Sequence, residues 1–238
     1  MTALQIQYDA NNLLEIGVDE AGRGPLFGRL YVGAAVLPKT TDFHHEWMKD
    51  SKKFHSKKKI KEVSEYIKEN AIAWSVQYVD ADVIDAINIR QSVFKGMHDA
   101  IREVLLKTGN QTAFLLIDGN DFRPFSYFDE TTEQICTLPH ETIEGGDNKY
   151  TAIAAASILA KVARDEYIGE LCAKHPELNE RYGLETNQGY GTKKHLDGIL
   201  EHGITQWHRK TYGRCKESYD NPIAPSLSQN ETANLTES

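Results

Sequence analysis

The sequence predicts an α/β domain built on a mixed sheet with helices on both faces. The clearest observation is the segment 113–118, five consecutive apolar residues that end in Asp118, which is typical of a central strand covered on both sides. Apolar or alternating patterns predict three further, mutually antiparallel strands, and helical spacing predicts two long helices. A length of 238 residues suits one domain with an elaboration. The strands are expected at 13–18, 30–37 and 72–79, and the helices at 89–107 and 150–174.

Composition narrows the class of protein. No apolar run approaches the ~20 residues of a membrane span, and the first residues lack a secretory signal. Three widely spaced cysteines show neither zinc-site nor disulfide spacing, so we expect a reducing, cytoplasmic setting. The net charge of −8 by itself argues against a nucleic-acid partner, although it hides how charge is distributed.

The apolar run 13–18 leads into two adjacent carboxylates, Asp19 and Glu20, and a glycine-rich turn, Gly22–Gly24, follows, which we interpret as a strand, an acidic turn and a second strand. Neighbouring carboxylates raise each other's pKa unless a cation lies between them. An all-oxygen site favours Mg²⁺ or Mn²⁺. A dinucleotide-binding loop is excluded by the glycine spacing and by the strand that follows. An ordinary acidic turn remains the alternative.

Seven lysines lie between Lys49 and Lys61, where a helix capped by Ser56 is expected to run to about Asn70. Lysines directly after the cap oppose the helix dipole. This placement suggests contacts to a phosphate backbone, and a solvated basic face is the alternative.

Asp118 lies at the carboxyl end of its strand, where open α/β sheets place their sites. A local Asx-turn is the alternative interpretation. An acidic turn is expected at 80–85, an aromatic and acidic surface loop at 121–133, and a weak strand interrupted by Pro139 at 135–143.

Asp147 precedes the helix predicted over 150–174, and helix capping alone could explain it. The small residues 152–160 should let this helix pack closely on the sheet. Asp165 and Glu166 are expected to form surface ion pairs.

Beyond residue 176, short helical pieces alternate with glycine-rich turns. Tyr190 lies between two glycines and is followed by basic residues, which suits stacking on a sugar or base. A simple Gly-Tyr turn is the alternative. A second basic and aromatic segment covers 202–212, and the polar tail 216–238 is predicted to be disordered.

The carboxylates of the first strand, the central strand and the long helix can converge on one point. With no histidine or cysteine they form a hard-oxygen site, and two divalent ions held there catalyse attack of water on a phosphodiester.

These motifs, taken together, resemble the successive signatures of type 2 ribonuclease H (ribonuclease HII). They match in order over about residues 13–215, and the combination is highly specific. The segments that carry the resemblance are 17–26, 50–53, 116–120, 146–147 with 155–162, 189–192 and 208–210.

The resemblance implies a ribonuclease H-like mixed five-stranded sheet in a catalytic domain over 1–215, with a small helical extension at 176–215. It implies hydrolysis 5′ to ribonucleotides in RNA–DNA hybrids and in duplex DNA, leaving 3′-hydroxyl and 5′-phosphate ends, for primer removal and ribonucleotide repair. A monomer is expected, and no sliding-clamp motif is visible.

The resemblance also assigns roles to residues. The metal ligands for two divalent ions, Mg²⁺ or Mn²⁺, would be Asp19, Glu20, Asp118 and Asp147. Gly22, Arg23 and Gly24 would read the 2′-hydroxyl, the group that distinguishes the substrate from DNA. Tyr190 would stack on the neighbouring deoxyribose. Phosphate contacts would come from Lys53, Ser157 and Lys161.

The sequence departs from the pattern of the family in two places. Asp118 and Asp147 are 29 residues apart, further than expected for bacterial members, and Phe27-Gly28-Arg29-Leu30 is unusual after the turn. Type 3 enzymes are less similar because they lack the turn arginine and carry an extra N-terminal domain. A hybrid nuclease without single-ribonucleotide activity and a catalytically silent hybrid-binding protein are the alternative functions.

Overall fold

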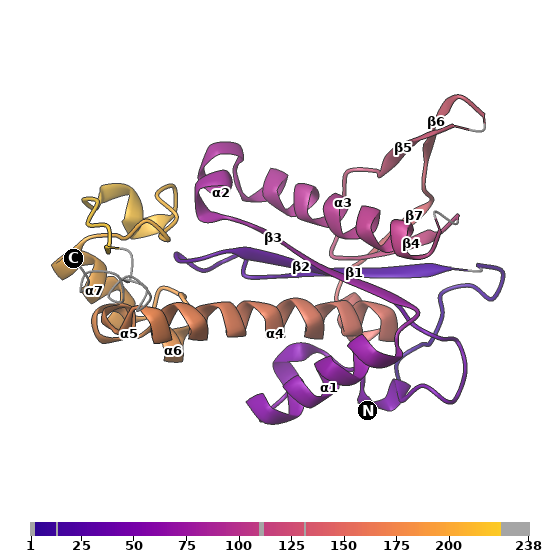
Figure 1. The fold of residues 1–238 in the computed structure, drawn as a ribbon, viewed down its shortest axis with the longest axis horizontal. Coiled ribbons are helices and arrows are strands. Elements are labelled where there is room, and N and C mark those ends of the chain that lie inside the picture. Colours follow the sequence, from indigo (N-terminus) through magenta and orange to yellow (C-terminus); the bar gives the residue numbers. More distant parts are fainter. Residues whose placement is uncertain (1–2, 13, 110–111, 131, 225–238) are drawn as a thin grey trace, which may run out of the picture.

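The computed structural model describes residues 3–12, 14–109, 112–130 and 132–224. Its centre is a five-stranded mixed sheet with helices on both faces, as predicted (Figure 1). Its strands are β1 (Glu15–Ala21), β2 (Leu30–Val36), β3 (Ala73–Val79), β4 (Phe114–Asp118) and β7 (His140–Ile143). They lie in the order β3-β2-β1-β4-β7. β2 pairs antiparallel with both β1 and β3, whereas β4 runs parallel to β1 and β7 runs parallel to β4.

Long helices cover the two faces of the sheet (Figure 1). α3 (Ile89–Lys107) packs on β2 and β3, and α4 (Thr151–Lys174) packs on β1 and β2 with α1 (Lys57–Asn70) beside it. These helices were predicted, and Ser56 caps α1 as expected. The shorter helices are α2 (Ala81–Ile87), α5 (Pro176–Tyr182), α6 (Leu184–Asn187), α7 (Lys193–His202), η1 (His45–Trp47), η2 (Ser51–Lys53), η3 (Gly146–Asn148) and η4 (Gly213–Glu217).

The closest approach between helix and sheet is made by α4, and glycines in the strands allow it. A Cβ placed on Gly17 would lie 2.2 Å from the carbonyl carbon of Ala152, and one on Gly33 would lie 2.2 Å from the carbonyl oxygen of Ala156. The prediction that the small-residue run of this helix packs closely on the sheet is therefore confirmed. These contacts fix the distance between α4 and the strands β1 and β2.

The acidic segment 80–85, predicted as a turn, belongs to the short helix α2. Ile84 is fully buried and anchors this helix to the core. Asn88 separates α2 from α3 with a φ of 66°, and its side-chain oxygen accepts a hydrogen bond from Gln91 N at 3.1 Å. Two buried residues, Ala81 and Ile84, in a short acidic segment are too weak a pattern to predict a helix.

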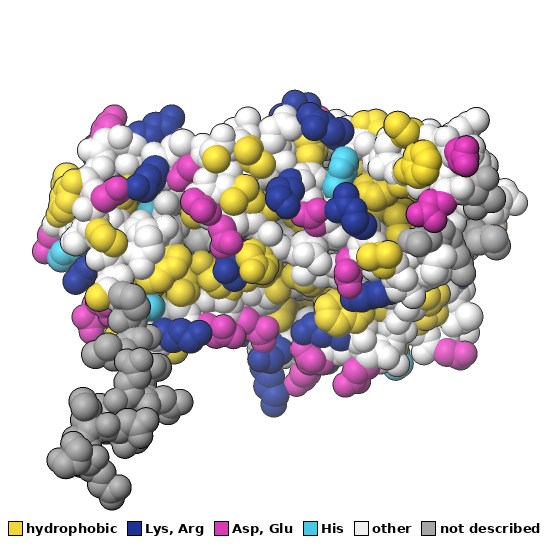
Figure 2. All heavy atoms as spheres, turned by 45° about the horizontal axis from the view of Figure 1, so that its top comes forward, with side chains coloured by type: hydrophobic (Ala, Val, Ile, Leu, Met, Phe, Trp, Pro, Cys, Tyr) yellow, Lys and Arg dark blue, Asp and Glu magenta, His cyan; other side chains and the backbone are white. Residues whose placement is uncertain are grey.

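The strand predicted at 135–143 with an interruption at Pro139 is present as two strands, β6 (Gln134–Thr137) and β7. The loop predicted at 121–133 differs, because it contains β5 (Ser126–Asp129), which pairs with β6 in a separate hairpin before β7 joins the main sheet. Pro139, which has no N–H to donate, lies where the chain passes from one sheet to the other. On the face that carries α3 and this hairpin, apolar and charged side chains are interspersed (Figure 2), with Phe128 and Ile135 among the exposed ones.

Short helices follow α4, as predicted. The tail prediction does not hold for 216–224, because Asn221 N donates to Ile204 O at 2.7 Å and Ile223 is buried. The remainder of that predicted tail, 225–238, lies outside the described residues.

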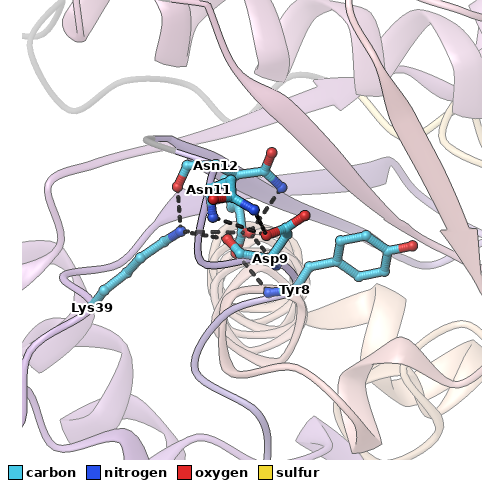
Figure 3. A network of polar contacts seen from close by, with 6 residues as sticks. Tyr8, Asp9, Asn11, Asn12 and Lys39 are labelled. Carbon is cyan, nitrogen blue, oxygen red and sulfur yellow. Dashed lines mark hydrogen bonds and ion pairs between the residues drawn. The ribbon is translucent and has the colours of Figure 1, made fainter.

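A polar network ties the N-terminal segment to the domain (Figure 3). Lys39 Nζ donates to Asn12 O at 2.6 Å, while the buried Glu15 accepts from the backbone N–H groups of Tyr8 and Asp9, both at 2.9 Å. Across the described ranges, a helix with the length and apolarity of a membrane span does not occur.

Candidate active site

Asp19 and Glu20 occupy the last residues of β1, which continues to Ala21, and not the turn after the strand as predicted. Asp19 is buried, and its Oδ1 accepts from Glu20 N at 2.7 Å. Burial, together with the charges of Glu20 and Asp118, holds the pKa of Asp19 well above its usual range. Burial also raises the pKa of Glu20, and the nearby Arg23 opposes this shift.

Asp118 ends β4 beside Asp19, because the parallel register pairs Val18 with Ile117 just before them. Its Oδ1 accepts a hydrogen bond from Gly146 N at 2.7 Å. The partner lies 28 residues along the chain, so the interpretation as a local Asx-turn is excluded. This bond draws the 3₁₀ turn η3 to the end of the sheet.

Asp147 lies in η3 and does not cap α4, whose N-cap is Tyr150. The capping explanation is therefore wrong. Asp147 is buried, and its Oδ1 accepts from Asn148 Nδ2 at 2.9 Å. Burial, with Asp50 and Asp118 nearby, raises its pKa.

Nearly all of the predicted site residues line one cavity of about 650 Å³. All four carboxylates line it. So do Gly22, Arg23, Gly24, Ser157, Lys161 and Tyr190. Lys53 does not line it but donates to Asn148 Oδ1, a residue that does.

The fit of this cavity to a divalent ion follows from its donor set. Within the described ranges, no three Asp, Glu, His or Cys side chains are arranged so that they could hold a metal ion together. The carboxylates nevertheless face one space, and burial beside other acids raises the pKa of Asp19 and Asp147. Such crowded acids need either protons or a cation, and an all-oxygen set suits Mg²⁺ or Mn²⁺.

The Gly22–Gly24 turn forms one wall of the cavity. The buried side chain of Arg209 binds the backbone of this turn. Arg209 donates to the carbonyl oxygens of Gly22 at 2.7 Å, Arg23 at 3.1 Å and Gly28 at 3.0 Å. The predicted basic segment 202–212 thus contributes to the interior, since Arg209 and His208 are 0% and 1% exposed. Sequence reasoning missed this role of Arg209.

Arg164 was also missed. It projects from α4 and donates through Nη2 to the carbonyl oxygens of Gln188 at 2.8 Å and Phe27 at 3.3 Å. It packs so closely under the turn that a Cβ on Gly22 would lie 2.3 Å from its Nε. The signal that could have found it is helical spacing, because Arg164 comes one turn after Lys161.

Asp50 is a further missed residue on this cavity. It accepts hydrogen bonds from Lys52 N at 2.9 Å and Asn148 Nδ2 at 3.3 Å. It lies within the lysine-rich segment 49–61, where a single acid gives no pattern that indicates a site.

The ring of Tyr190 lies beside the turn. Leu26 N donates to Gly189 O at 2.9 Å, and a Cβ on Gly24 would lie 3.6 Å from Tyr190 Cε1. Tyr190 is 51% exposed, so its ring presents a face to solvent. Lys161 is paired with Asp165 at 2.5 Å, as expected for that acid.

The family model described as "Ribonuclease HII" matches residues 16–215, most of the chain. The chain belongs to the ribonuclease HII family. As a member of that family it is an endoribonuclease, and the residues that line the cavity lie within the matched segment.

Individual proteins similar to this chain support the same family assignment. The chain is 42% identical over 207 residues to a ribonuclease HII of Parabacteroides distasonis, covering 87% of this chain and 94% of that protein. The crystal structure of the ribonuclease H2 from Pyrococcus horikoshii shares the fold with a TM-score of 0.66 at 21% identity, covering 86% and 96% of the two chains. Bst-RNase HIII, whose structure contains Mn²⁺, has a TM-score of 0.59 at 17% identity over 87% and 69%.

Proposed function

We propose that this ribonuclease HII hydrolyses the phosphodiester bond 5′ to a ribonucleotide, in RNA–DNA hybrids and at single ribonucleotides in duplex DNA. The products would carry 3′-hydroxyl and 5′-phosphate ends. The observation that carries the proposal is one cavity shared by four carboxylates, the Gly22–Gly24 turn and Tyr190.

Asp19, Glu20, Asp118 and Asp147 would hold Mg²⁺ or Mn²⁺. The bound ions would supply an activated water and neutralise charge on the leaving 3′ oxygen. The chain's own part is to keep the carboxylates on rigid elements: two at the end of a strand, one on the adjacent strand and one on a turn fixed by the Asp118–Gly146 bond. Lys161 and Ser157 would contact the phosphate from α4.

Recognition would depend on the turn and the tyrosine. Arg209 binds the carbonyl groups of Gly22 and Arg23, which fixes the turn for contact with a 2′-hydroxyl. The exposed ring of Tyr190 would stack on the neighbouring deoxyribose, next to Gly24 of the turn.

Cleavage-site mapping tests the specificity. A DNA duplex with one embedded ribonucleotide, with Mg²⁺ or Mn²⁺, should be cut once, on the 5′ side of that ribonucleotide. If this duplex survives while long hybrids are cut, the role given to the turn is wrong and the enzyme is a general hybrid nuclease.

A substitution tests the chemistry. Asp118→Asn should abolish cleavage dependent on Mg²⁺ or Mn²⁺, because an amide is a weak ligand for these ions, while binding of the duplex persists in a gel-shift assay. Asp99→Asn, on an acid of α3 that lies outside the cavity and pairs with Lys95, is the matched control and should retain cleavage. Unchanged cleavage by Asp118→Asn would remove this residue from the site.

A further inference from the structure

Two buried histidines connect the Tyr190 loop to the segment that follows the Gly22–Gly24 turn. His195, in α7, is 0% exposed and His208 is 1% exposed. His195 Nδ1 lies 3.0 Å from Tyr190 O, and the two rings face each other with their Nε2 atoms 3.1 Å apart. At the far end, His208 Nδ1 lies 2.9 Å from Thr205 N.

These contacts fix the position of each proton. The backbone N–H of Thr205 can only donate, so His208 Nδ1 accepts and its proton is on Nε2. His195 must then accept at Nε2 and carry its own proton on Nδ1, from which it donates to Tyr190 O. The bonds therefore run in one direction from Thr205 to Tyr190, and they require both rings to be neutral. Burial lowers the pKa of both histidines, which keeps them neutral at neutral pH.

The backbone around His208 is bonded to the other side of the site. Phe27 and His208 form an antiparallel bridge, and Arg209 N donates to Leu26 O at 2.8 Å. The Phe27 ring also packs edge-on against the His208 ring, with centroids 4.9 Å apart. The backbone of His208 is thus fixed to the segment that follows the Gly22–Gly24 turn, and its side chain is bonded to the Tyr190 loop through His195.

We infer that His195 and His208 are positioning residues that set the placement of the Tyr190 ring relative to the Gly22–Gly24 turn. Neither histidine lines the cavity, so they act through Tyr190 and not on the substrate. The inference rests on the proposed function, in which the tyrosine and the turn enclose the ribonucleotide junction.

Two substitutions of His195 separate its hydrogen bond from its volume. His195→Leu fills the space without a donor, whereas His195→Asn keeps an N–H directed at Tyr190 O. For the duplex with one ribonucleotide, His195→Leu should raise KM about tenfold, the factor for one lost hydrogen bond, with kcat nearly unchanged. His195→Asn should recover most of this loss. A purely structural role would instead lower the active fraction, and hence kcat, at constant KM.

The Tyr190→Ala background tests whether the effect passes through the tyrosine. There, His195→Leu should change KM less than about twofold, because residues that act as one unit are not additive. A tenfold change in both backgrounds would overturn the inference.

Tyr182→Phe is the matched control. Tyr182 packs against both imidazole rings, but its hydroxyl donates to Gly203 O at 3.0 Å, away from the Tyr190 loop. This variant should lower Tm and leave KM unchanged; a raised KM would show that general loosening of the cluster suffices.

Nitrogen-15 NMR of the wild-type imidazoles gives a readout that is independent of activity. We expect a proton on Nδ1 of His195 and on Nε2 of His208, and the opposite pair of tautomers would overturn the inference. If wild-type enzyme does not cut the single-ribonucleotide duplex, the proposed function fails, and the tautomers still decide whether the bonded chain exists.

Discussion

Two buried arginines, Arg209 and Arg164, lie against the Gly22–Gly24 turn and are 0% and 2% exposed. Arg209 donates to three backbone carbonyl oxygens, whereas Arg164 donates to two through Nη2 and its Nε has no hydrogen-bond partner among the described residues. Burial of a charged group is costly unless its donors are satisfied. Only a guanidinium offers several donors in one plane, so Arg209 can bind three carbonyl groups at once.

Arg209→Lys tests this geometry. Lysine keeps the charge but has a single compact ammonium, which cannot reach the carbonyl oxygens of Gly22, Arg23 and Gly28 together. We expect a loss of about 2–4 kcal/mol in the free energy of unfolding, measured with urea, and weaker cleavage at single ribonucleotides. Arg214→Lys, on an exposed arginine, should change stability by less than about 0.5 kcal/mol. Equal stability of the two variants would contradict the role of Arg209.

The buried histidines predict how stability depends on pH. Burial, with His195 adjacent, lowers the pKa of His208 to about 3. Between pH 6.5 and 3 the unfolded chain therefore binds a proton that the folded chain does not, so stability is lost as the pH falls through this window. Wild-type protein should lose about 1 kcal/mol more than His208→Asn between pH 6 and pH 5, measured by urea unfolding at each pH. Identical losses would show that the histidine pair is not held neutral.

At the level of elements, the contact between α4 and the sheet determines where the site forms. In Gly17→Ala, the new Cβ would lie 2.2 Å from the backbone of Ala152. Backbone cannot rotate away, so α4 must lift from the sheet. We expect a loss of about 3 kcal/mol in the free energy of unfolding and reduced cleavage, because α4 also carries Ser157 and Lys161.

Gly169→Ala is the control in the same helix. A Cβ there meets no atom within 4 Å, and alanine favours a helix over glycine by about 0.5–1 kcal/mol. This variant should be at least as stable as wild type in the same urea titration. If Gly17→Ala were equally stable, the close approach of α4 would not constrain the fold.

Elements with a long local pattern could be predicted from the sequence, and short ones could not. The bounds of α3 match the prediction, because its apolar residues repeat over five turns. In contrast, β7 has four residues and one buried side chain, Ile143, so the sequence predicts it only as part of a weak strand at 135–143, and its pairing with β4 gives its place in the sheet. The hairpin β5–β6 likewise has exposed or half-buried side chains and no buried stripe to reveal it.

In the candidate site, the carboxylates could be predicted from the sequence, whereas the buried polar residues behind them could not. Asp19 and Asp118 could be found because each comes directly after an apolar run, and both line the cavity. Arg209 and His208 could not, because a buried polar residue is defined by its partners. The partner Gly22 lies 187 residues from Arg209 along the chain. Resemblance to a family pointed to this segment but not to its place in the interior.

On the scale of the whole molecule, a net charge of −8 by itself argues against a nucleic-acid substrate. The distribution resolves the conflict. Acids concentrated in the cavity are those that a divalent ion would neutralise, whereas lysines cluster at η2 and the start of α1, with Lys52 on the cavity. The duplex would therefore meet a basic surface next to an acidic, metal-binding centre.

The salt dependence of binding decides between the two interpretations of these lysines. If Lys57 and Lys58 contact phosphates, Lys57→Gln with Lys58→Gln should lower the slope of log KM against log salt concentration by about 1–2, since each phosphate contact contributes about 0.9. Lys95→Gln, on α3 across the sheet and paired with Asp99 at 2.6 Å, is the control and should leave the slope unchanged. The same slope in all three proteins would mean that the lysines at the start of α1 form only a solvated basic face, and that the contacts to phosphate lie around the cavity itself.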